Sequence, residues 1–309
     1  MIHDDSVPDQ VARHLADDTL AIFLIHGVIP RQTHKVRNYT GKHMTADLFA
    51  KVMRRLAGEG IPLSMNQVLE YSESGCLPPP RSFAVTFDDG FENNLSVAAP
   101  IMADHGIPGM IYATTSFVEQ NGMSWIDRIE YAVEDCSART LRVAWTDQVF
   151  PLDGAESRVE FLKAVRRYVK NAPHCDSSCF ADELCAELGK PGRLSSDDPL
   201  DLKLGWDQIR ATHGNGLILF GGHTHTHPIL SFLSPERLAF ELDTSLGLMR
   251  DKGGVGATHY SYPEGLAHCF NGTVIDELKT RNVRCCPTAI DGVNRAGTDP
   301  FHLLRIMVA

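Results

Sequence analysis

The chain lacks the long apolar runs of a membrane protein. No stretch reaches the roughly 18 apolar residues that a transmembrane helix requires. The first five residues, MIHDD, carry neither the basic region nor the apolar region of a secretory signal peptide. We therefore expect a cytoplasmic protein with no transmembrane segment. Internal repeats and low-complexity tracts are missing as well, so neither a repeat array nor a disordered chain is expected.

The chain has fewer basic than acidic residues. The 309 residues include 29 lysines and arginines against 39 aspartates and glutamates, which gives a formal net charge of -10. The overall field of such a chain repels nucleic acids and anionic membrane surfaces. We therefore expect no nucleic-acid partner.

The eight cysteines show no short disulfide framework. Such scattered cysteines are typical of free thiols in a reducing compartment. The most closely spaced group, His174, Cys175, Cys179 and Cys185, fits no common zinc finger or ribbon. Apolar residues recur through it with helical spacing, so we expect thiols on a helix there rather than a metal site.

The sequence does contain an alternation of short apolar strands and amphipathic helices. Strands are expected over 20–25, 82–87, 109–113, 217–220, 259–262 and 303–307, and helices over 45–58, 65–71, 95–105, 125–134, 206–212, 234–252 and 271–280. This order indicates an α/β fold, either a layered sheet or a barrel, with its site at the C-terminal ends of the strands. Between 135 and 204 the pattern becomes mainly helical. We interpret 135–204 as an insertion in one catalytic domain spanning 1–309.

Two adjacent carboxylates end the strand over 82–87. Residues 82–90 read SFAVTFDDG, an apolar and β-branched run that stops at Asp88, Asp89 and Gly90. Adjacent residues of an extended strand point to opposite faces, and Gly90 allows the backbone to turn. We therefore expect the two aspartates to have different roles, one binding a cation and the other handling a proton.

A histidine cluster ends a second strand. Residues 217–228 read LILFGGHTHTHP, which places three histidines in five positions directly after an apolar run. Neutral imidazoles clustered in this way are typical metal ligands. Pro228 argues against a continued strand, so we expect the segment to curl and bring His223 and His227 together, with His225 outside the ligand set. One carboxylate and two histidines leave coordination positions open, as a catalytic metal requires.

These two segments resemble the first two motifs of the polysaccharide deacetylases, carbohydrate esterase family 4, which includes the nodulation-type chitooligosaccharide deacetylases. The matching residues are 86–90 (TFDDG) and 223–228 (HTHTHP), each at a strand end. Further fragments resemble the polysaccharide-biosynthesis branch of the family: 23–26 (FLIH), 125–128 (WIDR), 206–207 (WD), 262–265 (YPEG) and 303–306 (LLRI). The similarity spans about residues 20–308 and implies a distorted (β/α) barrel of about seven units with a mainly helical insertion.

The resemblance implies a role for each residue of the two motifs. Asp89, His223 and His227 would hold one divalent metal ion, zinc in the first place, with cobalt, nickel or manganese as alternatives. Such an ion lowers the pKa of a bound water, and Asp88 would take the proton from that water as general base. The substrate would be a small molecule or an oligosaccharide carrying an N-acetyl sugar, and acetate would be released.

The third motif of the family is altered in this chain. Residues 260–265 read YSYPEG, whereas the family commonly has an arginine where Ser261 stands and an aromatic residue where Glu264 stands. That arginine normally orients the catalytic aspartate through charge-assisted hydrogen bonds, so Arg305 or Arg128 is expected to replace it. The resemblance gives the main-chain N–H of Glu264 a catalytic part, stabilising the oxyanion.

The remaining expectations concern the leaving amine and the sugar. Family members usually protonate the amine with a histidine near the C-terminus, but the matching segment here reads LLR. We expect His26, at the end of the first strand, to supply this proton or to contact the substrate. Asp127, Trp125, Tyr262 and Arg305 are expected to bind the substrate, with Trp125 able to stack on a sugar face.

Three other functions remain open. Relatives resembling this fold open cyclic ureides and imides, so a cyclic amide hydrolase is one alternative. Two histidines and a carboxylate also form the facial triad of iron-dependent oxygenases, although the second adjacent aspartate counts against that class. Ser261 and Arg305, which stand where catalytic side chains are expected, leave a glycan-binding pseudoenzyme as the third.

Overall fold

A parallel sheet forms the centre of the computed structural model, which describes residues 6–172, 175–192 and 195–309. The strands lie in the order β10, β1, β5, β6, β9, and the short β4 pairs with the start of β5. They are β1 (Ala21–Ile25), β4 (Ile61–Pro62), β5 (Ser82–Phe87), β6 (Gly109–Ala113), β9 (Ile218–Gly222) and β10 (Ile306–Met307). β1, β5 and β6 are buried along their whole length, as strands covered on both faces must be.

The sheet closes on itself through isolated contacts. Two single parallel bridges continue it beyond β9, Gly222 to Tyr260 and His259 to Cys285. The N–H of Thr288 then donates to the carbonyl of Leu303 at 2.9 Å, and β10 pairs with β1. The strands expected over 259–262 and 303–307 are thus reduced to single bridges and the two-residue β10. The result is the distorted (β/α) barrel that the family resemblance implies.

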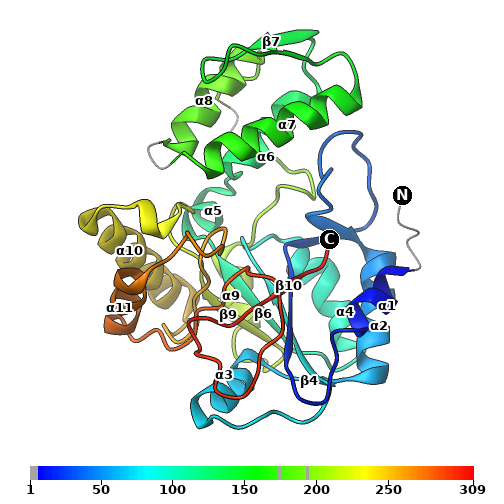
Figure 1. The fold of residues 1–309 in the computed structure, drawn as a ribbon, viewed down its shortest axis with the longest axis vertical. Coiled ribbons are helices and arrows are strands. Elements are labelled where there is room, and N and C mark those ends of the chain that lie inside the picture. Colours follow the sequence, from blue (N-terminus) through cyan, green and yellow to red (C-terminus); the bar gives the residue numbers. More distant parts are fainter. Residues whose placement is uncertain (1–5, 173–174, 193–194) are drawn as a thin grey trace.

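Helices surround this barrel (Figure 1). They are α1 (Val7–Ala12), α2 (Ala46–Glu59), α3 (Met65–Ser74), the π-helical η2 (Asn94–Ala98), α4 (Ala99–Ala103), α5 (Thr115–Gln120), α9 (Trp206–Thr212), the 3₁₀ helix η3 (Leu230–Phe232), α10 (Pro235–Gly253) and α11 (Gly272–Thr280). Thr45 and Ser234 cap α2 and α10 as predicted, because each side chain accepts a hydrogen bond from a backbone N–H in the first turn.

A helical lobe lies beside the C-terminal ends of the strands, as the green part of Figure 1. It contains α6 (Trp125–Glu134), an antiparallel hairpin of β7 (Thr140–Arg142) and β8 (Val149–Pro151), α7 (Ala155–Lys170) and α8 (Ser177–Glu187). The lobe has its own apolar cluster, to which α6 contributes Ile129 and Val133. The packing unit therefore begins in α6, before the boundary at 135 that the sequence suggests.

A loop over residues 30–42, here called the strap, joins two short paired strands. These are β2 (Gly27–Ile29) and β3 (His43–Thr45), which follow β1 and precede α2. Figure 1 shows the strap as the blue loop that rises toward the helical lobe. The strap therefore connects the barrel mouth to the lobe.

Two features bear on the class of protein. Among the described residues, no helix combines the length and the apolar composition needed to cross a bilayer. All eight cysteines carry free thiols, among them Cys179 and Cys185 on α8. His174, which the sequence places beside them, lies outside the described residues.

Candidate active site

The turn after β5 separates the two aspartates. Asp89 and Gly90 both adopt a left-handed backbone with a φ of 76°, so the turn begins one residue before the glycine. A Cβ at Gly90 would lie 3.1 Å from the Cβ of Ala113, which favours glycine there. Asp88 and Asp89 are both buried. Their carboxylates face different partners, as the sequence predicts for two residues with different roles.

The histidine segment curls after β9, as predicted. Thr224 and His227 have φ values of 65° and 63°, and the N–H of His227 donates to Oγ1 of Thr224 at 2.9 Å. The curl brings the rings of His223 and His227 to 4.9 Å between centroids. His225 turns away from them, and its Nδ1 lies 2.9 Å from Oγ1 of Thr115.

Asp89, His223 and His227 converge on one point. The Nε2 atoms of His227 and His223 lie 3.2 and 3.6 Å from Oδ1 of Asp89, and one ligand atom from each residue lies within 4.8 Å of the other two. Oδ1 is buried and accepts no hydrogen bond from the described part of the chain. A buried carboxylate oxygen is unfavourable unless something satisfies it. These residues therefore fit a divalent cation held by one carboxylate and two imidazoles.

The hydrogen bonds and charges around the three residues suit metal binding. Nδ1 of His223 lies 2.9 Å from the carbonyl oxygen of Ser261. Because a carbonyl only accepts, Nδ1 carries the proton and Nε2 keeps its lone pair for a metal. Burial alone would raise the pKa of Asp89, but Lys42 and His227 hold that pKa well below its usual range. Asp89 is therefore ionised.

Arg305 holds the carboxylate of Asp88. Its Nη1 and Nη2 donate to Oδ1 and Oδ2 of Asp88, both at 2.8 Å, which is a bidentate pair. Nη2 also donates to Oγ of Ser261 at 2.9 Å. Burial would raise the pKa of Asp88, but Arg305 keeps it below the ordinary value. Arg305 thus occupies the place of the arginine missing at Ser261, whereas Arg128 pairs with Asp182 on α8.

Arg305 and Tyr262, which are predicted to bind the substrate, are both buried in packing contacts. Arg305 is 1% exposed and Tyr262 is not exposed at all. The ring of Tyr262 stacks on Phe270 at 4.3 Å between centroids, and its hydroxyl donates to the carbonyl of Phe301 at 3.3 Å. Neither side chain has a surface left for a sugar.

Asp127, which is predicted to bind the substrate, faces two lysines. It is 5% exposed, and Nζ of Lys42 donates to its two carboxylate oxygens at 3.2 and 3.4 Å. Nζ of Lys203 lies 4.0 Å from Oδ2 of Asp127 and 3.8 Å from the ring centroid of Phe91. Burial lowers the pKa of Lys203 to about 8.

Neither Lys42 nor Lys203 is predicted as a site residue from the sequence. Lys42 lies in a loop of turn residues and basic charge after the first strand, and that composition is the signal that could have identified it. Lys203 follows a loop with no motif of its own. Its position depends on an isolated antiparallel bridge to Phe91, which no local pattern predicts.

His26 lies at the end of β1, close enough to Asp88 and Asp89 for both to act on its pKa. Burial lowers the pKa of His26 to about 4, against the opposing effect of the two carboxylates. The imidazole is therefore neutral at pH 7. A neutral imidazole can donate or accept a hydrogen bond but holds no extra proton for a leaving amine.

A cleft of about 780 Å³ opens beside the cation site, between the barrel and the helical lobe. His227 and Glu264 line it from the barrel, and Trp125 and Lys170 line it from the lobe. Lys170 forms an ion pair with Glu264 across the cleft. Trp125 is half-buried, so part of its ring remains available to a ligand, as the prediction of sugar stacking requires.

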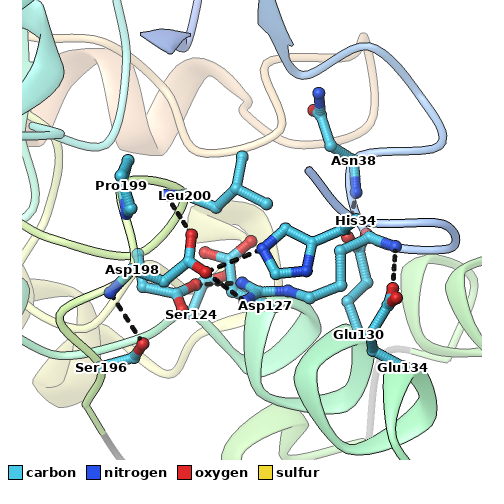
Figure 2. A network of polar contacts seen from close by, with 12 residues as sticks. His34, Asn38, Ser124, Asp127, Glu130, Glu134, Ser196, Asp198, Pro199 and Leu200 are labelled. Carbon is cyan, nitrogen blue, oxygen red and sulfur yellow. Dashed lines mark hydrogen bonds and ion pairs between the residues drawn. The ribbon is translucent and has the colours of Figure 1, made fainter. Parts of the chain in front are cut away.

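The strap is fastened to the lobe by a polar network (Figure 2). The carboxylate of Glu134 on α6 accepts hydrogen bonds from the backbone N–H groups of residues 35, 36 and 37 at 2.8 to 3.1 Å. Glu130, one turn earlier, accepts from the N–H of Asn38 at 3.1 Å. Nε2 of His34 lies 2.7 Å from Oδ2 of Asp198. These bonds fix the strap, and with it Lys42, relative to α6.

Glu241 on α10 supports the curled histidine segment from below. It is fully buried and accepts hydrogen bonds from the N–H groups of His225 and Thr226 at 2.9 and 2.8 Å and from Oγ1 of Thr226 at 2.6 Å. Its remaining partner is Arg237, whose Nη2 lies 2.9 Å away. Glu241 thus fixes the backbone between the two ligand histidines.

We expect Glu241→Ala to lower the free energy of unfolding by about 2 kcal/mol, because three donors lose their acceptor. Zinc affinity should fall as well, since the backbone between His223 and His227 is no longer held. Chemical denaturation and metal titration measure the two effects. Arg237→Ala, which removes a half-exposed partner of the same carboxylate, should cost less than about 1 kcal/mol. Equal losses from both variants would contradict this account.

The solved structures most useful for comparison are deacetylases. The Streptococcus pyogenes deacetylase PplD in complex with acetate is 16% identical, with a TM-score of 0.60 over 94% of this chain and 92% of that chain. IcaB from Ammonifex degensii is 17% identical, with a TM-score of 0.60 over 96% and 94%. The BpsB deacetylase domain from Bordetella bronchiseptica is 16% identical, with a TM-score of 0.56 over 94% and 96%. At these identities the likeness shows the fold.

Comparison by sequence gives the family. No curated protein matches the chain. A family model described as polysaccharide deacetylase matches residues 77–285, which is more than half of the chain and includes Asp88, Asp89, His223 and His227. The chain therefore belongs to the polysaccharide deacetylase family.

Proposed function

We propose that this protein is a metal-dependent hydrolase that removes the N-acetyl group from an amino sugar, either within a glycan or on a conjugate, and releases acetate. The observation that carries the proposal is that two adjacent carboxylates, Asp88 and Asp89, have different partners, one suited to a general base and the other to a metal ligand. Asp89 converges with His223 and His227 on one point, and Asp88 next to it is a carboxylate held ionised by Arg305. His227, one of the three converging residues, also lines the cleft of about 780 Å³.

Asp88 is the general base in this proposal. Its carboxylate is buried, ionised and oriented by a bidentate arginine, so it is ready to accept a proton from the attacking water. A divalent ion, zinc in the first place, supplies acidity to that water and polarises the amide carbonyl when it is bound at Asp89, His223 and His227. The backbone N–H of Glu264, at the edge of the cleft, is assigned to the developing oxyanion.

The other residues act on the substrate. Trp125 presents an aromatic surface in the cleft on which a sugar ring can stack. His26 is assigned to a hydrogen bond with the substrate rather than to proton donation, because its imidazole is neutral at pH 7. The general acid is left without an assigned residue.

The position of Arg305 bears on the pseudoenzyme alternative. That alternative has two grounds, the missing arginine at Ser261 and the missing histidine where Arg305 stands. The first ground matters because an unoriented aspartate would be a poor base. Arg305 reaches the same carboxylate from the C-terminal segment, which supports an active enzyme. The charge on Asp88 and its fixed orientation are the two properties that catalysis requires of it.

Acetate release tests the proposal. The protein is incubated with N-acetylglucosamine oligomers and with nucleotide-linked and lipid-linked N-acetyl sugars, and acetate is measured. We expect release from at least one of them, loss of release after treatment with a chelator, and recovery on addition of zinc. Asp88→Asn should bind zinc as the wild type does but lower kcat/KM by about 10²-fold or more.

Three outcomes separate the alternatives. Zinc binding without acetate release from any of these compounds would favour a glycan-binding protein. Release from a cyclic imide or ureide, and none from the sugars, would favour the cyclic amide hydrolase. Oxygen consumption with iron and a 2-oxo acid would favour the oxygenase.

A further inference from the structure

Lys42 touches the carboxylate assigned to the metal, and the mechanism above gives it no part. Its Nζ lies 3.0 Å from Oδ2 of Asp89, whereas Oδ1 of Asp89 faces His227 and His223 at 3.2 and 3.6 Å. The two oxygens of one carboxylate are therefore divided between a lysine and the two histidines. The side chain of Lys42 is 14% exposed, so this contact is shielded from water.

We propose that Lys42 is a positioning residue of the metal centre. Its ammonium group binds Oδ2 of Asp89, so that only Oδ1 is available to the cation, and its positive charge weakens cation binding. The inference rests on the proposed function, because it concerns the same metal ion. It assigns to Lys42 two measurable effects, one on the number of oxygens that Asp89 gives to the cation and one on the affinity of the site.

The surroundings of Lys42 keep it at Asp89. Both carboxylate oxygens of Asp127 accept hydrogen bonds from its Nζ, and the ring of Phe91 lies 4.7 Å from the same nitrogen. Asp127 sits on α6, the helix that also fastens the strap through Glu134. Lys42 is thus held from both sides, by its own loop and by the lobe.

Electrostatics sets the direction of the expected change. Two positive charges that face the two oxygens of one carboxylate repel one another strongly in a shielded site, even at an effective dielectric constant of about 20. Removing the charge of Lys42 should therefore tighten cation binding. General damage to the site would weaken cation binding. The direction of the change in cation affinity therefore separates a positioning role of Lys42 from a structural one.

Cobalt titration of the purified protein tests the proposal. Co²⁺ reports its coordination through its visible absorption, which falls as the number of ligands rises. We expect Lys42→Gln to bind Co²⁺ at least about tenfold more tightly than the wild type, with a weaker visible absorption per bound ion, because Oδ2 of Asp89 becomes available. Lys42→Arg keeps the charge and should stay within about threefold of the wild-type affinity.

Asp127→Asn serves as a matched variant that should change the cation affinity in the opposite direction. It leaves Lys42 charged and removes the carboxylate that offsets that charge, so Co²⁺ affinity should fall, by about threefold or more. Lys42→Met provides a second neutral variant in case the glutamine fails to fold, and circular dichroism confirms the fold of each. Affinity gains from the neutral variants together with a loss from Asp127→Asn would support the proposal.

Two results would overturn it. In the first, the wild-type protein binds Co²⁺, but Lys42→Gln and Lys42→Met bind it no more tightly and give an unchanged spectrum. That result would contradict the role of Lys42 and leave the proposed function intact. Wild-type protein that binds neither Co²⁺ nor Zn²⁺ removes the metal from the proposed function, and the role of Lys42 with it.

Discussion

Replacing Arg305 with methionine is expected to lower kcat/KM for deacetylation by about 100-fold or more, because the group that orients the general base is lost. The same change should lower the free energy of unfolding by about 3 to 5 kcal/mol, since Asp88 becomes an unpaired charge in a buried site. Arg305 is 1% exposed and gives Asp88 two hydrogen bonds at 2.8 Å. Acetate release and chemical denaturation measure the two effects.

The pH profile separates this role of Arg305 from general damage. Arg305 holds the pKa of Asp88 below its ordinary value against the opposing effect of burial. Asp88 acts as a base only when it is ionised, so loss of the arginine should move the acid limb of the kcat/KM profile to higher pH. The lowered pKa also stabilises the fold at neutral pH, and this stabilisation is lost as pH falls through the folded-state pKa.

Two further variants sharpen the Arg305 test. Arg295→Met removes an exposed arginine that pairs with Asp18 at 3.3 Å and should cost less than about 1 kcal/mol. Ser261→Arg combined with Arg305→Ser moves the guanidinium to the position where the family commonly carries it. Oγ of Ser261 lies 3.5 Å from Oδ2 of Asp88. The double variant should therefore recover part of the activity that Arg305→Ser alone loses. An unshifted acid limb in Arg305→Met would contradict the assigned role.

The two candidate metal-binding segments could be predicted from the sequence because each follows a predicted strand, whereas the choice of Asp89 over Asp88 as the ligand came from the family resemblance. Asp89 follows directly on a buried strand, and His223 and His227 follow on another. Strand ends of a parallel sheet share one edge, so the meeting of the two segments needs no knowledge of loops. Pro228 was sufficient to predict the curl, which the left-handed backbone at His227 completes. Helix caps such as Thr45 were predictable for the same reason.

The partners of the aspartates are less accessible to sequence reasoning. Arg305 pairs with Asp88 from 217 positions away, and only the closure of the barrel brings the two together. Sequence alone left Arg305 and Arg128 open as replacements for the missing arginine. Lys42 depends on a loop whose course is fixed by carboxylates on α6. Tyr262 stands in a motif and yet packs inward, because the expected strand around it is reduced to isolated bridges.

Replacing His227 with asparagine should weaken zinc binding by more than about 100-fold. Loss of an outer partner of a metal ligand alone costs about 10 to 100-fold, and here one of three protein ligands is removed. The wild-type site should also bind zinc less well as pH falls. Burial lowers the pKa of His227, but Asp89 holds it above the ordinary value, so the proton competes with the cation at mildly acidic pH. This competition should be reduced in the variant.

His225→Asn is the matched control for His227→Asn, because it changes the same residue type two positions away in the same curled segment. His225 bonds Thr115 and packs against Phe240 instead of facing Asp89, so its replacement should leave zinc affinity within about threefold of the wild type. Competition with a chromogenic chelator over pH 5.5 to 8 measures all three proteins. A zinc affinity that falls equally in the two variants would show that the segment, and not the imidazole of His227, holds the ion.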